Sequence, residues 1–138
     1  MTESQLQQVA LRTAMIVKRL QLEKTAQQRL KLGIEINGIT LAAGEADQQA
    51  FTRLLTLLRE AHELQPDAAS KNAFMNTPQV ITDIRGMPHT LPGVKALRQL
   101  LVAYGAAIRD LWTTHAMRKA AIRSATTREE LDAVPHGN

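Results

Sequence analysis

The residues best suited to metal binding or proton transfer are the four histidines, and they are widely spaced along the chain. They are His62, His89, His115 and His136. Histidine ligands of a zinc ion usually stand a few residues apart in the sequence, and no two histidines here have that spacing. The carboxylates near them, Glu63 and Asp110, are ordinary neighbours in a helical sequence. The sequence therefore gives no sign of a metal site, and we expect no cofactor.

The side chains that could act as covalent nucleophiles are also isolated. A catalytic serine needs a base within hydrogen-bond reach, and Ser4, Ser70 and Ser124 have no adjacent histidine. The chain contains no cysteine, which excludes disulfide bonds and thiolate chemistry. A phosphate-binding loop needs clustered glycines, whereas the seven glycines of this chain are dispersed. We therefore expect a protein that is not an enzyme.

The charged residues change sign along the sequence. The net charge of +4 arises from a basic segment at residues 1–32, an acidic segment at residues 33–70 and a basic segment at residues 71–138. A nucleic-acid-binding protein usually gathers one sign of charge on one face, so this pattern argues against nucleic acid as the partner. Opposite charges in separate segments would let subunits attract one another, although ordinary solvated helix faces explain the pattern equally well.

The sequence shows neither a signal peptide nor a membrane-spanning segment. The first residues, MTESQLQQ, are polar. No apolar run approaches the roughly 20 residues that cross a bilayer. We therefore expect no contact with a membrane.

Leucine and alanine dominate the apolar residues, and both favour helices. The spacing of apolar residues predicts three long helices, over residues 4–32, 45–64 and 93–124. Gly33 is expected to end the first helix, because glycine is favoured just beyond a helix C-terminus. Pro66 is expected to stop the second helix, since proline lacks the backbone N–H that a helix needs. The chain is therefore predicted to be mainly helical.

Two hairpins and a short terminal helix complete the predicted elements. Residues 34–41 place alternating apolar residues on either side of an Asn-Gly pair, which is typical of a tight two-residue turn. A second, shorter hairpin is expected over residues 80–91. Residues 66–79 have no apolar period and are predicted to form a loop. Thr127, followed three residues later by Glu130, predicts the capped start of a last short helix.

The expected fold class is α+β and mainly helical. Its order is helix, hairpin, helix, hairpin, helix and short helix, with a small antiparallel sheet from the two β-hairpins. A lone hairpin is only marginally stable, so joining both hairpins into one sheet would help each of them. We divide the chain into residues 1–32, a long N-terminal helix for oligomerisation or attachment, and residues 33–138, a compact α+β domain.

Apolar stripes on two long helices are the candidate protein interface. On the first helix the apolar residues recur at intervals of three and four over about two heptads, as in helices that pair with other helices. The third helix carries the longest stripe in the chain. The tentative interface consists of Leu6, Val9, Ile16, Leu20, Tyr104, Ile108, Trp112 and His115. Each stripe could instead pack inside its own domain, and the sequence does not tell which helix is core and which is interface.

Several segments together resemble a domain family of unknown function that is common in tailed phages and prophages. The resemblance rests on GIEINGITL (residues 33–41), ADQQAFTRL (residues 46–54) and KAAIRSATTREEL (residues 119–131). It extends over roughly residues 18–134. Members often carry a tryptophan in the second hairpin, where this chain has ITDI at residues 81–84. Such domains are found in tail-fibre and other tail-associated proteins.

The resemblance implies a non-enzymatic structural protein of the bacteriophage tail, in its fibre, baseplate or connector. It brings no catalytic residues. The expected partners are copies of the chain itself, as a trimer or symmetric ring, and other phage tail proteins. The expected location is the virion and, during assembly, the host cytoplasm. Two alternatives stay open: a tail-fibre assembly chaperone absent from the mature particle, and a nucleic-acid-binding accessory protein.

Overall fold

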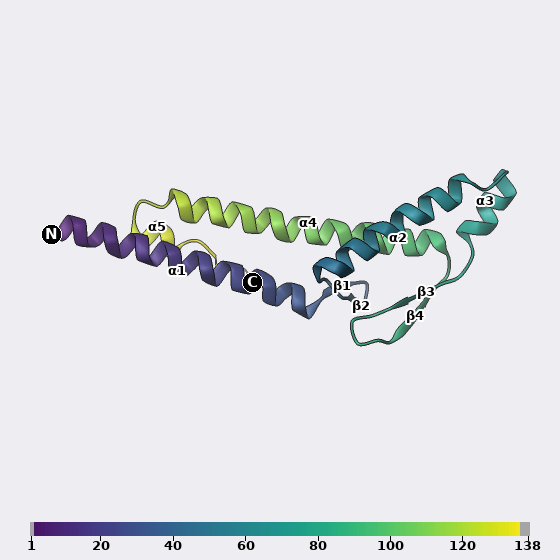
Figure 1. Cartoon of the computed structure of the whole chain (residues 1–138), viewed down its shortest axis with the longest axis horizontal. Coiled ribbons are helices and arrows are strands. Elements are labelled where there is room, and N and C mark those ends of the chain that lie inside the picture. Colours follow the sequence, from purple (N-terminus) through teal and green to yellow (C-terminus); the bar gives the residue numbers. More distant parts are fainter. Residues whose placement is uncertain (1, 136–138) are drawn as a thin grey trace. The chain divides into compact units, whose positions relative to one another are not determined.

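The structure is a computed structural model that describes residues 2–135, and it confirms a mainly helical α+β fold (Figure 1). The helices are α1 (Glu3–Leu32), α2 (Glu45–Glu63), α3 (Ala68–Met75), α4 (Val94–Ser124) and α5 (Arg128–Asp132). The strands are β1 (Ile34–Ile36), β2 (Ile39–Leu41), β3 (Gln79–Thr82) and β4 (Pro88–Leu91). The three long helices therefore begin and end within one residue of their predicted bounds.

The chain divides into two compact units, and helices α1 and α4 each contribute residues to both. Unit 1 comprises Met1–Arg29 and Asp110–Asn138, and unit 2 comprises Leu30–Arg109. This division differs from the expected boundary between residues 32 and 33. The reason is that α5 and the last part of α4 pack with the first part of α1, a long-range pairing that no local sequence pattern announces.

In unit 1, residues 110–124 of α4 lie alongside α1, and α5 closes the core (Figure 1). The buried core residues are Leu22, Ile122, Ala125, Leu131 and Val134, with half-buried Leu11, Ala14 and Met15 against them. Lys18 is also buried, and its Nζ donates to the carbonyl oxygen of Leu131 at 2.6 Å. That carbonyl lies in the last turn of α5, where the negative end of the helix dipole stabilises a positive charge.

Of the two hydrogen bonds predicted to cap the N-terminus of α5, one forms as expected and the other has a different backbone partner. The side chain of Thr127 accepts a hydrogen bond from the backbone N–H of Glu130 at 3.1 Å, as expected of a cap. The carboxylate of Glu130 reaches back one residue further than predicted and accepts from the backbone N–H of Thr126 at 2.8 Å. Two backbone N–H groups at this helix start, those of Thr126 and Glu130, are thus hydrogen-bonded by side chains.

Unit 2 is built around the first part of α4. Its buried apolar residues are Leu30, Leu41, Ala43, Leu58, Ile81, Val94, Leu97, Leu100, Leu101, Tyr104 and Ile108. The hydroxyl of Tyr104 donates to the carbonyl oxygen of Ala42 at 2.8 Å, and its ring meets Phe51 edge-on at 4.9 Å. Gly33 has a φ of +84°, and a Cβ there would lie 2.7 Å from the carbonyl oxygen of Leu41. Close packing and backbone conformation both require glycine at this position.

The two hairpins form separate sheets, so the expectation of one joint sheet is wrong. β1 pairs with β2 across the Asn-Gly turn, and β3 pairs with β4 with Pro88 as the first residue of its strand. One backbone hydrogen bond, from Ile84 N–H to the carbonyl oxygen of Thr40 at 2.8 Å, connects the two sheets. Ile84 lies in a turn, and a turn residue offers no continuous ladder for a shared sheet.

The prediction of a loop over residues 66–79 is wrong, because α3 lies within it. Asp67 caps this helix by accepting a hydrogen bond from the backbone N–H of Ser70 at 2.7 Å. Lys71 donates to the carbonyl oxygens of His62 and Glu63, at 3.1 and 3.2 Å, and so covers the end of α2. Caps and local contacts stabilise α3 without an apolar stripe, so a search for apolar period alone misses it.

Candidate protein interface

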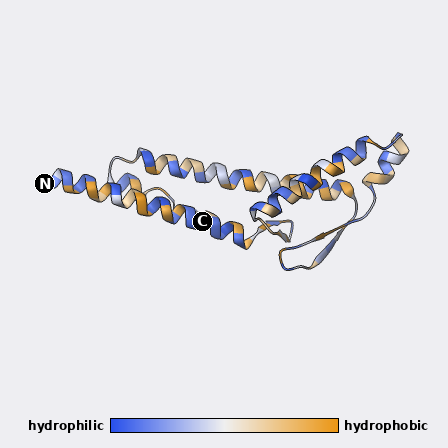
Figure 2. Ribbon diagram, in the orientation of Figure 1, coloured by the Kyte–Doolittle hydropathy of each residue, from blue (hydrophilic) through white to orange (hydrophobic). Residues whose placement is uncertain are grey.

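Helix α1 carries apolar residues on two opposite faces. Residues two positions apart in an α-helix lie about 200° apart around its axis. Leu20 is 62% exposed and Leu22 is 2% exposed, so the two faces have opposite surroundings. The face of Leu22 and Ala26 belongs to the core of unit 1. The face of Leu20 is open to solvent, and Figure 2 shows hydrophobic residues recurring along the whole helix.

We call the large, solvent-facing apolar residues in the unit 1 part of α1 the α1 stripe. It consists of Leu6, Val9, Ile16, Val17 and Leu20, which are between 48% and 62% exposed. Four of these five were predicted as interface residues, and the structure places all four at the surface. Val17 was not among them, because it breaks the spacing of three and four.

The structure places the four interface candidates of α4 differently. Tyr104 and Ile108 are buried in unit 2, and His115 is buried in unit 1. Trp112 is half-buried and meets the ring of His115 edge-on at 5.4 Å. The regular apolar stripe of α4 thus serves the cores of the two units, whereas the weaker stripe of α1 faces solvent.

A basic groove lies beside the α1 stripe within unit 1. Its volume is about 280 Å³, and its lining consists of Arg12, Met15, Ile16, Arg19, Lys119, Ile122 and Arg123. Ile122 is buried and forms part of an apolar floor. Ile16 belongs to both the groove and the α1 stripe, so the two surfaces are continuous. The combination of apolar floor and cationic rim suits a ligand that is apolar and anionic at once.

Three of the four groove cations have no ionic partner in the described chain. Within residues 2–135, no carboxylate oxygen lies within 4.0 Å of the guanidinium groups of Arg12, Arg19 or Arg123. Lys119 is the exception, because its Nζ lies 3.2 Å from Oε1 of Glu23. The rim therefore retains positive charge that the chain itself does not neutralise.

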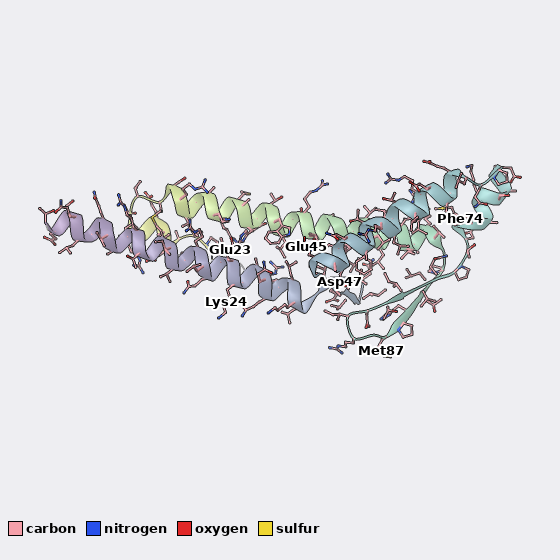
Figure 3. All side chains as sticks on the ribbon, in the orientation of Figure 1. Glu23, Lys24, Glu45, Asp47, Phe74 and Met87 are labelled. Atoms are coloured by element: carbon pink, nitrogen blue, oxygen red, sulfur yellow. The ribbon has the colours of Figure 1, made fainter. Side chains whose placement is uncertain are left out.

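Glu23 joins Lys119 to the buried histidine of unit 1. Its Oε1 lies 3.1 Å from Nε2 of His115, and this hydrogen bond is the main reason that the pKa of Glu23 is lowered. Desolvation opposes the lowering, and Lys119 reinforces it. Figure 3 shows Glu23 on the side of α1 that faces α4, and Lys24 on the other side. The cluster satisfies His115 locally and holds Lys119 at the groove.

The remaining histidines serve local structure or lie outside the described residues. His89 in β4 is hydrogen-bonded through Nε2 to Oδ2 of Asp83, in the turn between β3 and β4, at 2.7 Å. His62 supplies a carbonyl oxygen to the cap at the end of α2. In residues 2–135, no three His, Asp or Glu side chains converge as metal ligation requires. His136 lies outside the described residues.

Sequence reasoning found the α1 stripe but missed the basic groove. Arg118, Lys119 and Arg123 were recognisable as a basic cluster near a helix end, where cations complement the helix dipole. The contribution of Arg12 and Arg19 depends on how α1 packs beside α4. The available signal was the shared basic character of residues 1–32 and 71–138.

Fold and surface together define a small, mainly helical α+β protein with an exposed apolar helix face beside a basic groove. Among the described helices, none is both long and apolar enough to cross a membrane. In comparisons with known proteins, no family model, no curated protein and no solved structure matches this chain.

Proposed function

We propose that this chain is a non-enzymatic structural protein of a bacteriophage tail that acts by binding other protein chains through the α1 stripe. The exposure of that stripe carries the proposal, because five large aliphatic side chains lie on one face of a single helix. Contiguous apolar patches on soluble proteins commonly mark interaction sites. The resemblance of the sequence to tail-associated domains supplies the setting in the fibre, baseplate or connector.

The energy available from the α1 stripe favours repeated or extended contacts over a single isolated one. Complete burial of a Val, Leu or Ile side chain contributes ~1.5–3 kcal/mol, so covering the exposed half of five such residues contributes about 5 kcal/mol. Association costs roughly 4–15 kcal/mol in lost freedom of motion. The stripe alone therefore gives weak binding. In a symmetric tail, simultaneous contacts of several copies raise the effective affinity.

The proposed partners are copies of the chain itself, in a trimer or symmetric ring, and other tail proteins. Two leucines of α1 that stand two positions apart offer a matched test of the role of the stripe. Leu20→Asp adds a charge to the exposed face, whereas Leu22→Asp adds the same charge to the core of unit 1. We expect Leu20→Asp to remain helical by circular dichroism and to lose self-association by light scattering. We expect Leu22→Asp to unfold unit 1, because a buried unpaired charge is costly.

Two results of this comparison would contradict the proposal. The first is that the wild-type chain stays a monomer of 15.2 kDa, both on its own and when mixed with the other tail proteins. The second is a Leu20→Asp variant that associates as strongly as the wild-type chain. Either result means that the exposed stripe of α1 is not a protein interface.

A second experiment separates a structural protein from an assembly chaperone. A structural protein remains in the finished particle, so mass spectrometry of purified virions should detect this chain at a fixed ratio to other tail proteins. A chaperone leaves before the particle is complete. Detection in infected-cell extracts combined with absence from washed virions would therefore favour the chaperone.

A further inference from the structure

We infer that the basic groove of unit 1 binds an amphipathic helix of a different protein, one whose apolar face is flanked by carboxylates. This inference rests on the proposed function and names the chemistry of one partner. The groove lies between α1 and α4, which run side by side in unit 1. A third helix laid between two packed helices continues the packing of a helical bundle. Its apolar residues would cover the floor formed by Met15, Ile16 and Ile122.

Charge identifies the partner as acidic. Arg12, Arg19 and Arg123 border the groove without a carboxylate within 4.0 Å in residues 2–135. Arg123 lies in the last turn of α4, where it also complements the helix dipole. Arg12 and Arg19 lie in the middle of α1, where the dipole offers no such explanation. Glutamate or aspartate side chains along a bound helix would neutralise both, since an arginine fork matches a carboxylate.

A second copy of α1 does not fit this groove. Helix α1 (Glu3–Leu32) has only two acidic side chains, Glu3 and Glu23, and Glu23 is already paired with His115 and Lys119. A second α1 laid in the groove would also bring Arg12 and Arg19 toward cations of the same kind. Like charges placed together at an interface disfavour that pairing. The groove is therefore assigned to a different chain, while the α1 stripe outside it is available for copies.

The apolar floor distinguishes a protein partner from other polyanions. Nucleic acid is held mainly by cations and hydrogen-bond donors directed at phosphates, and an aliphatic floor gives a phosphate backbone nothing to contact. A membrane presents a broad anionic surface, whereas the arginines here border a concave groove. An acidic helix satisfies the floor and the rim together, as in other helix-in-groove complexes.

The test uses the full chain and three fluorescently labelled synthetic helices of equal length. The first peptide has leucines on one face and glutamates beside them. The second has lysine in place of each glutamate, and the third has serine in place of each leucine. Fluorescence anisotropy should show the first peptide binding at least tenfold more tightly than the other two. Higher salt should weaken its binding, because rim charges are screened.

Matched variants of α1 assign this binding to the groove. Exposed charge pairs contribute modestly, so the double variant Arg12→Gln with Arg19→Gln should weaken binding of the glutamate peptide about tenfold. Lys24→Gln removes a positive charge from α1 outside the groove and should leave binding within about twofold of wild type. Circular dichroism checks that both variants keep the wild-type helix content.

Several outcomes would overturn the inference and leave the proposed function intact. One is equal binding of the glutamate and lysine peptides, or equal binding to the double arginine variant and to the wild-type chain. Another is a loss of self-association in the double arginine variant, which would give the groove to a second copy. A third is arginine-dependent binding of a DNA duplex or of phosphatidylserine vesicles in place of the peptide. The comparison of Leu20→Asp with Leu22→Asp decides the proposed function independently.

Discussion

Replacement of Leu131 by alanine tests whether α5 is an integral part of unit 1. Leu131 is 1% exposed and packs in the cluster that contains Leu22 and Ile122. A five-residue helix has no stability of its own, so α5 depends on this packing, on its cap and on the hydrogen bond from Lys18. The alanine variant removes the largest of these contributions.

The expected cost follows from the burial of the side chain. Leucine-to-alanine replacements in cores reduce the free energy of unfolding by about 3–5 kcal/mol, and the lower value applies where a neighbouring segment can settle into the space. Because α5 has only five residues and can settle into the space, we expect about 3 kcal/mol. With a typical urea dependence of about 2 kcal/mol per molar, the midpoint of unfolding should fall by about 1.5 M.

The assay is urea unfolding followed by tryptophan fluorescence and by circular dichroism. The chain has a single tryptophan, Trp112, and it lies in unit 1, so its fluorescence reports on that unit. Leu57→Ala is the control, because Leu57 is 61% exposed in the middle of α2 and its truncation should change stability by less than about 0.5 kcal/mol. A Leu131→Ala midpoint equal to the wild-type value would refute the reasoning and show that α5 does not contribute to the stability of unit 1.

Three further predictions concern unit 2. Gly33→Ala and Gly38→Ala both force alanine to a φ of +84°, which costs ~1–2 kcal/mol. Gly33→Ala should cost ~2 kcal/mol more in thermal unfolding, because its Cβ would lie 2.7 Å from a carbonyl oxygen, whereas nothing lies within 4 Å of the Cβ at Gly38. Equal costs would contradict the close packing. Burial raises the pKa of Tyr104, the single tyrosine, to about 12. The stability that depends on its protonated hydroxyl is therefore complete below pH 10 and is lost as the pH rises through 12. Tyrosinate absorbance should titrate near 12 in the native chain and near 10 in urea. The hydrogen bond from His89 is the main reason that the pKa of Asp83 lies below 3.8. The stability that the ionised Asp83 contributes is therefore present above pH 3.8 and is lost as the pH falls below that value. Asp83→Asn should make the urea midpoint depend less on acid pH, and an unchanged dependence would contradict the assignment.

The three long helices and the first hairpin were predictable because local signals specify them. Apolar spacing set the bounds of the three long helices, and the Asn-Gly pair at residues 37 and 38 set the register of β1 with β2. Asn37 does adopt the positive φ, of 51°, that such a turn requires. Helix α3 was missed because its stability comes from the Asp67 cap and from Lys71, which apolar spacing does not reveal.

The candidate site was predictable only in part, because exposure depends on tertiary packing. The sequence showed apolar stripes on α1 and α4 without indicating which one the chain covers itself. The more regular stripe, with Tyr104 and Ile108, proved to be core. The lining of the basic groove combines Arg12 and Arg19 with residues about a hundred positions later in the chain. No local pattern contains that information.

The discontinuous make-up of unit 1 has a consequence for the order of folding. Unit 2 consists of the continuous segment Leu30–Arg109, so all its contacts are available once that segment has been synthesised. Unit 1 combines a segment that precedes Leu30–Arg109 with a segment that is synthesised after it, so the earlier segment must wait for the later one. Contacts between distant segments form slowly, since loop closure must come before they stabilise anything. During synthesis α1 therefore exposes both of its apolar faces, and in that interval a folding helper or a neighbouring nascent copy has access to Leu22 as well as to the α1 stripe.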